Sequence, residues 1–133
     1  MKRLSIIGLI IVLYLSSVID LFAISSKSET LQNAAVANGN GTASSIQDYT
    51  TVVIQVAGTF TATVNFEVST DGTNYTAIQC FSVADKTSVV TTVTVAGAWR
   101  CNIIGLAKMR ARISGYGSGA VTVRAMYNSA GVF

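Results

Sequence analysis

Two cysteines carry the most definite chemistry in this 133-residue chain. In an oxidising compartment the even cysteine count favours one disulfide between Cys80 and Cys101. It would close a loop of about 20 residues and contribute on the order of 3 kcal/mol. The alternative is two buried free thiols, which pack as small hydrophobic side chains. The chain has no His, and two cysteines alone cannot complete a tetrahedral zinc site.

Five basic residues form a second candidate site, and they hold most of the domain's positive charge: Arg100, Lys108, Arg110, Arg112 and Arg124. Lys108, Arg110 and Arg112 alternate, so they share the outer face of one strand, and Arg124 could join them across a hairpin. Such a stripe suits phosphate, anionic lipid head groups, acidic glycan, or Asp48 or Glu67 of a neighbouring copy. The alternative is a solvated outer face. Nucleic acid is disfavoured, because no aromatic residue alternates with the cations as a stacking platform.

Carboxylates give little support for catalysis. Glu67 is predicted on an outward row, whereas Asp71 and Asp85 lie in turns, so a pair for glycoside hydrolysis is not expected to form. The segment 69–75 is similar to an Asp-box hairpin, in which the Asp71 carboxylate would bond its own turn. Residues 115–119 lack the Lys-Ser/Thr ending of a phosphate loop, and they predict a flexible hairpin tip where Tyr116 could contact a ligand. We predict no enzyme, no cofactor and no metal site.

The elements that must position these residues are β-strands. Half of the residues are apolar, only 11% are charged and the net charge is +3, which disfavours disorder. Apolar and polar residues alternate over several stretches, as along 60–68, and turn signals such as Asp71-Gly72 separate them. The pattern predicts eight or nine short strands, at 30–37, 42–47, 51–57, 60–69, 75–82, 88–95, 98–105, 107–114 and 120–128. This indicates an all-β fold, an antiparallel, jelly-roll-like β-sandwich over residues 31–133.

The N-terminal segment is predicted to be separate from the β-sandwich domain. Lys2 and Arg3 precede a mostly apolar run at 4–24, which reads as an apolar helix in a signal peptide, residues 1–25. The competing interpretation is a retained membrane anchor, since about 20 apolar residues span a bilayer. Asp20 counts against deep burial. Both interpretations place the domain outside the cell, and residues 26–30 would be a short spacer.

Several stretches resemble a small β-sandwich domain common among phage structural proteins. The resemblance is carried by residues 31–35, 49–60, 64–78, 97–100, 105–106, 109–114 and 118–123. It implies a virion-surface or tail-associated module with no known catalytic residues. Phage proteins that assemble in the cytoplasm rarely begin with a signal-like segment. That segment points instead to a membrane-containing virion, a secreted surface protein or an extracellular filament subunit.

Two functions of different classes follow. The first is a non-enzymatic structural subunit, exported to a virion or extracellular surface, that packs against copies of itself or other structural subunits. The alternative is a secreted module that binds glycan or an anionic ligand through Trp99, Tyr116 or the basic residues. Burial of both Trp99 and Tyr116 would remove the best ligand contacts of that module.

Overall fold

The structure is a computed structural model that describes residues 24–129. The predicted N-terminal helix, whether signal or anchor, lies outside these residues. Between residues 24 and 129 there is no helix of the length and apolarity that a membrane span requires.

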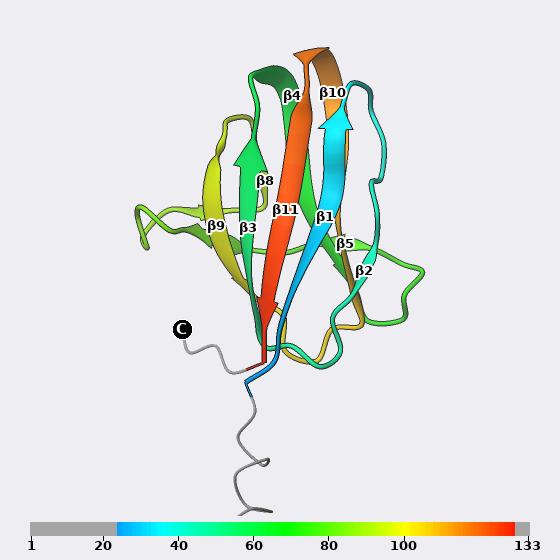
Figure 1. Ribbon diagram of the computed structural model, residues 1–133, viewed down its shortest axis with the longest axis vertical. Helices are drawn as coiled ribbons and strands as arrows, with labels where there is room; N and C mark the ends of the chain where they lie inside the picture. The colour runs from blue at the N-terminus through cyan, green and yellow to red at the C-terminus, as the bar shows by residue number, and fades with distance from the viewer. Residues whose placement is uncertain (1–23, 130–133) are drawn as a thin grey trace, which may run out of the picture.

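The described chain forms two antiparallel sheets that face each other (Figure 1). Sheet A has the order β1-β11-β3-β9-β6-β7, and sheet B has the order β2-β10-β4-β5, with β8 also paired to β4. The strands of sheet A are β1 (Ser26–Ala35), β3 (Thr51–Ala57), β6 (Cys80–Ser82), β7 (Val89–Val90), β9 (Gly97–Asn102) and β11 (Val121–Asn128). Those of sheet B are β2 (Ser44–Ser45), β4 (Phe60–Ser69), β5 (Thr76–Ala77), β8 (Thr92–Val93) and β10 (Lys108–Gly119). The predicted all-β, antiparallel two-sheet fold is confirmed.

The core lies between the sheets and is built by the predicted alternation. The inward rows of the long strands are buried: Val52, Ile54, Val56, Ala62, Val64, Phe66, Val68, Trp99, Cys101, Met109, Ala111, Ile113, Val121, Val123, Ala125 and Tyr127. Phe66 of sheet B meets Trp99 of sheet A with ring centroids 5.9 Å apart. Burial of each large apolar side chain contributes about 1.5–3 kcal/mol, so these rows hold the two sheets together.

Two predicted strands are in fact crossings between the sheets. The predicted strand 75–82 divides into β5 in sheet B and β6 in sheet A, and the predicted strand 88–95 divides into β7 in sheet A and β8 in sheet B. Backbone of Phe66 fixes both crossings. Its carbonyl accepts from Ile78 N–H at 3.0 Å, and its own N–H donates to Thr91 O at 3.0 Å. Crossing strands cannot keep one alternating face, which explains why Val93 is buried while Val89 is 46% exposed.

The predicted spacer 26–30 is wrong, because these residues belong to β1. They pair in register with β11 from Ser26–Asn128 to Thr30–Arg124. Lys27 and Glu29 form a 2.6 Å ion pair in this strand, at the edge of sheet A. Charged residues on an edge strand disfavour pairing with another chain.

The predicted hairpin tip at 115–119 is also wrong. Strand β10 continues to Gly119, with a register shift between Ser114 and Ser118 against β4. The reversal comes at Gly119, where φ is +86° and a Cβ atom would collide with the carbonyl oxygen of Thr59. After this turn the chain enters sheet A, so β10 and β11 lie in different sheets.

Candidate functional site

The outer face of sheet A carries a row of side chains that crosses the sheet. The register pairs Met126 with Val53, Val53 with Arg100, Arg100 with Phe81 and Phe81 with Val89. Their inward neighbours fill the core, so the row points to solvent. Met126 is 45% exposed, Val89 46% and Phe81 37%. We call this row of Met126, Val53, Arg100, Phe81 and Val89 the outer row. It combines apolar surface with one central cation.

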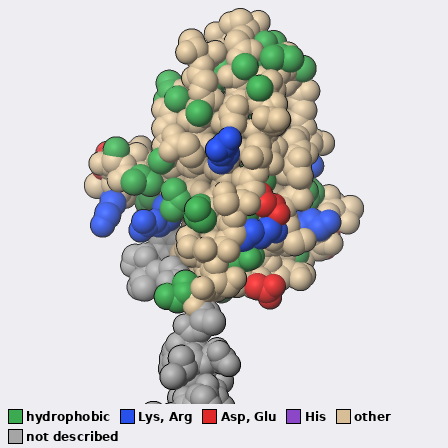
Figure 2. Space-filling view, in the orientation of Figure 1, with side chains coloured by type: hydrophobic (Ala, Val, Ile, Leu, Met, Phe, Trp, Pro, Cys, Tyr) green, Lys and Arg blue, Asp and Glu red, His purple; other side chains and the backbone are tan. Residues whose placement is uncertain are grey.

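A surface pocket of about 270 Å³ lies at one end of the outer row, lined by Phe81, Ser82, Val83, Lys86 and Arg100. Phe81 and Ser82 come from β6, Arg100 comes from β9, and Val83 and Lys86 come from the loop that joins β6 to β7. Figure 2 views this face, where green hydrophobic side chains lie beside blue Lys and Arg side chains near the projecting hairpin of Figure 1. The pocket therefore offers an apolar wall together with two positive charges.

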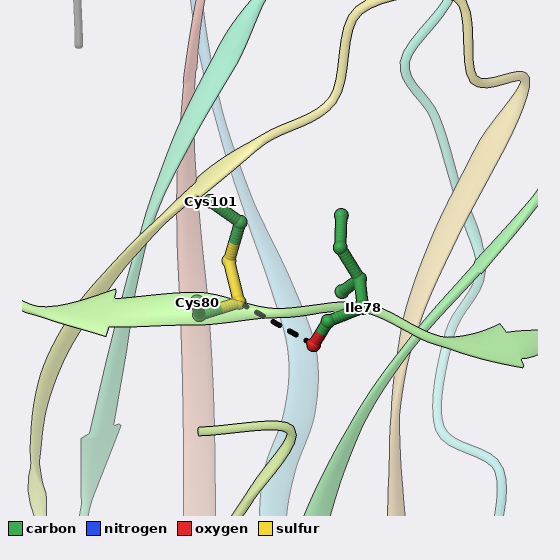
Figure 3. Close-up of a disulfide and its surroundings, with 3 residues drawn as sticks. All are labelled: Ile78, Cys80 and Cys101. Carbon is green, nitrogen blue, oxygen red and sulfur yellow. Dashed lines mark hydrogen bonds between the residues drawn. A yellow bond between two sulfur atoms is a disulfide. The ribbon is translucent and has the colours of Figure 1, made fainter. Parts of the chain in front are cut away.

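A disulfide between Cys80 and Cys101 joins β6 to β9 beside this pocket (Figure 3), as the sequence predicts. The two residues are direct register partners, with Cα atoms 4.4 Å apart and no solvent exposure. Cys80 Sγ lies 4.0 Å from Ile78 O, at the point where the chain enters sheet A. The next register pair along the two strands is Phe81 with Arg100. The disulfide therefore fixes the separation of two pocket walls.

The predicted basic stripe is divided between the two sheets. Lys108, Arg110 and Arg112 lie on β10 in sheet B, whereas Arg100 and Arg124 lie on β9 and β11 in sheet A. The expectation that Arg124 joins the others across a hairpin is wrong, because the chain changes sheets at Gly119 and β11 pairs with β1 and β3. Five cations on opposite outer faces cannot form one anion site.

Arg110 and Arg112 share one counterion, Glu67 of the neighbouring strand. Arg110 Nε donates to Glu67 Oε2 at 2.8 Å, and Arg112 Nε donates to Glu67 Oε1 at 2.7 Å. Arg110 also stacks 3.9 Å from the centroid of the Tyr75 ring. Burial raises the pKa of Glu67, but the hydrogen bonds and charges of Arg112 and Arg110 outweigh it, so its pKa lies below the usual 4.5. Glu67 is therefore committed within the chain, contrary to the expected contact with a neighbouring copy.

Neither predicted aromatic ligand residue is free on the surface. Trp99 is buried in the core, at 6% exposure. Tyr116 is half-buried against the core, and its hydroxyl donates to Gly119 O at 2.8 Å. The glycan-binding interpretation therefore loses Trp99, while Tyr116 keeps part of its surface exposed.

Asp71 is confirmed as part of a turn. Its Oδ1 accepts from the N–H groups of Thr73 and Asn74 and from Ser69 Oγ, each at 2.8 Å. These bonds, led by the one from the Asn74 backbone, hold the pKa of Asp71 far below its ordinary 3.8. Between residues 24 and 129, no three side chains of His, Cys, Asp or Glu gather as a metal site would require. The carboxylate of Asp71 is a folding device.

The pocket residues Val83 and Lys86, and Val89 of the outer row, escaped the sequence analysis. Val89 had been assigned to one strand with Val93, which concealed its exposure. A signal was present in Val89-Val90-Thr91-Thr92, where two adjacent apolar residues and two adjacent polar ones break strict alternation. Such a break is compatible with a strand that leaves its sheet.

Fold and site together define a β-sandwich module with a disulfide across neighbouring strands and a basic, apolar outer face. The chain belongs to the XepA family, whose sequence profile matches residues 25–126.

Two solved structures share the fold. The crystal structure of the SPBc2 prophage-derived protein YomS has a TM-score of 0.74 and 19% identity, and the match covers 80% of this chain and 96% of that one. The crystal structure of the PBSX exported protein XepA has a TM-score of 0.76 and 18% identity, covering 80% of this chain and 39% of that one. The chain thus spans well under half of that XepA chain. No curated protein sequence matches this chain.

Proposed function

We propose that this protein is a non-enzymatic structural subunit, exported and incorporated in a phage virion or another extracellular assembly. The observation that carries the proposal is the outer row, where Met126, Phe81 and Val89 are each more than a third exposed on one sheet face. Exposed apolar residues gathered on one face are typical of protein contact sites.

The comparisons and the disulfide also support the proposal. The chain belongs to the XepA family, one similar structure is of a prophage-derived protein and another is of an exported protein. The Cys80–Cys101 disulfide suits an oxidising compartment outside the cytoplasm. Membrane attachment through residues 4–24 is part of the same proposal if that segment is retained.

The alternative, a secreted module for glycan or an anionic ligand, keeps only the pocket at Arg100 and Lys86 in its favour. Trp99 and Tyr116 are occupied by packing and by an internal hydrogen bond. The aromatic residue in the pocket wall, Phe81, belongs to the apolar outer row, so we favour the structural role.

Light scattering of the full chain after size-exclusion chromatography tests the proposal. We expect a discrete oligomer, and Phe81→Ser combined with Met126→Ser should move the protein toward monomer. Ile104→Ser is the matched control, because Ile104 is 64% exposed but lies outside the outer row. A protein that stays monomeric at high concentration, or an oligomer that only Ile104→Ser disrupts, would contradict the proposal.

A further inference from the structure

We propose that the pocket lined by Phe81, Val83, Lys86 and Arg100 binds an acidic peptide segment of a partner protein, in which a carboxylate lies beside an apolar side chain. The inference rests on the proposed structural role in one respect, since a structural subunit must hold another protein. It names the site and the chemistry of that partner.

The two cations of the pocket are uncommitted. Within residues 24–129, neither Lys86 nor Arg100 takes part in an ion pair or a side-chain hydrogen bond. On sheet B, by contrast, Arg110 and Arg112 both bond Glu67. Asp85 precedes Lys86 in the chain, but its Oδ1 accepts from Thr87 N–H at 2.9 Å and from Thr87 Oγ1 at 2.7 Å. The pocket therefore has positive charge without an internal counterion among its lining residues.

The apolar walls of the pocket indicate which group should lie beside the anionic group of the ligand. Phe81 is 37% exposed and Val83 is 50% exposed, both beside the cations. A free inorganic anion would leave these walls in water. A ligand with an aliphatic or aromatic group next to its charge would cover them and gain from their burial.

A peptide fits this pocket better than a nucleic acid or another polyanion. A polyanion is held by a track of cations along its backbone. Here the remaining exposed arginine of sheet A, Arg124, lies on β11, which is separated from β9 by β3. The other three cations of the predicted stripe lie on sheet B.

The edge of sheet A also favours a peptide. Strand β7 is the terminal strand of this sheet, and Val89 on β7 is the register partner of Phe81. An extended segment can add to a sheet edge through its backbone while its side chains enter neighbouring pockets. The apolar surface continues from the pocket to this edge, so one extended segment could contact both.

The disulfide should control the pocket. Phe81 follows Cys80, and Arg100 precedes Cys101 on the partner strand. Strand β6 has three residues and β7 has two, so few backbone bonds hold this wall without the disulfide. Reduction should therefore loosen Phe81 relative to Arg100 before it disturbs the long strands.

The test is an NMR titration of the full ¹⁵N-labelled chain with the peptide acetyl-Val-Glu-Phe-Glu-Val-amide. We expect shift changes at the amides of Phe81, Lys86 and Arg100. Arg100→Gln and Lys86→Gln should each weaken binding by about 3-fold to 5-fold. Arg124→Gln is the matched control on the same sheet and should leave the affinity unchanged. The double variant Cys80→Ala with Cys101→Ala should weaken binding while the β11 signals stay in place.

Several results would overturn the inference. Equal binding of the glutamine peptide acetyl-Val-Gln-Phe-Gln-Val-amide would show that the cations are not used. An equal loss with Arg124→Gln would show diffuse attraction, and tighter binding of inorganic polyphosphate at Lys86 and Arg100 would assign the pocket to a polyanion. If the chain forms the discrete oligomer but the peptide fails to bind the same chain diluted to monomer, where Phe81 is accessible, the pocket alone is refuted. Peptide binding by a strictly monomeric chain would refute the self-association instead.

Discussion

Two regions of this sandwich are held together by different means. The long strands β1, β3, β4, β10 and β11 are bonded along seven to twelve residues each and share the buried core. The segment 76–93 contains only β5 to β8, of two or three residues each. It is held by the disulfide, by the two backbone bonds of Phe66 and by short ladders. Most of the core lies in the first region, whereas four of the five pocket residues, Phe81, Ser82, Val83 and Lys86, lie in the second.

The two outer faces also differ in how their charged side chains are paired. On sheet B, Arg110 and Arg112 both bond Glu67, which offsets one of their two positive charges. On sheet A, Arg100 and Lys86 line a pocket with apolar walls. Because paired charges are largely satisfied within the chain, unpaired ones indicate where a partner can add interaction energy.

The largest expected effect comes from Phe66→Ala, which would affect both regions at once. The side chain is fully buried against Trp99, and its loss should destabilise the fold by about 3–5 kcal/mol. Urea denaturation would measure this as a lower midpoint of a single transition. The exposed Val95→Ala is the control and should change stability little. A small effect of Phe66→Ala would mean that the two sheets are not coupled through this residue.

Removal of the disulfide should destabilise the short-strand segment 76–93 more than the long strands. Cys80→Ala with Cys101→Ala is expected to cost about 2–3 kcal/mol, because the cross-link closes a loop with a sequence separation of 21. Hydrogen exchange should accelerate at 76–93 more than in β3, β4 or β11. Uniform acceleration throughout the chain would contradict the claim that the disulfide stabilises the short strands locally.

Glu67→Gln should destabilise only the long-strand region, and by less than removal of the disulfide destabilises the segment 76–93. It leaves two arginines without their carboxylate, and we expect a loss of about 1–3 kcal/mol at neutral pH, reduced by the partial exposure of Arg112. The folded pKa of Glu67 lies below 4.5, so its contribution is complete above pH 4.5 and is lost as the pH falls through the folded value.

Chemical denaturation between pH 7 and pH 2 checks this prediction. The stability difference between wild type and Glu67→Gln should shrink toward acid. A difference that stays constant, or that grows as the pH falls, would show that the ion pairs do not contribute through the charge of Glu67.

The sequence predicts the long-strand region well and the short-strand region poorly, for a physical reason. Strict alternation marks the core rows of β3, β4, β10 and β11, because each strand stays in one sheet. Residues 75–95 change sheets twice, so no single period describes them. The disulfide was predicted correctly from the even cysteine count together with the expectation of export, neither of which depends on strand pairing.

Site residues were predicted less well because strand neighbours in space are not always neighbours in sequence. Arg124 was placed beside Arg112 on the assumption of a hairpin, whereas the chain changes sheets at Gly119. The alternation in β4 and β10 predicts that Glu67 and Arg110 lie on the outward face. It does not predict which residues of the two strands pair with each other. Only the observed pairing of Arg110 with Glu67 shows that Arg110 has a partner within the chain.

The proposed contact surface of this protein is the outer row together with its pocket. Hydrogen exchange of the assembled protein, compared with the same chain diluted to monomer, tests it most directly. We expect added protection on assembly at 80–90 and 97–102, with little change in β10. Protection confined to β10 and β4, or none on sheet A, would contradict it.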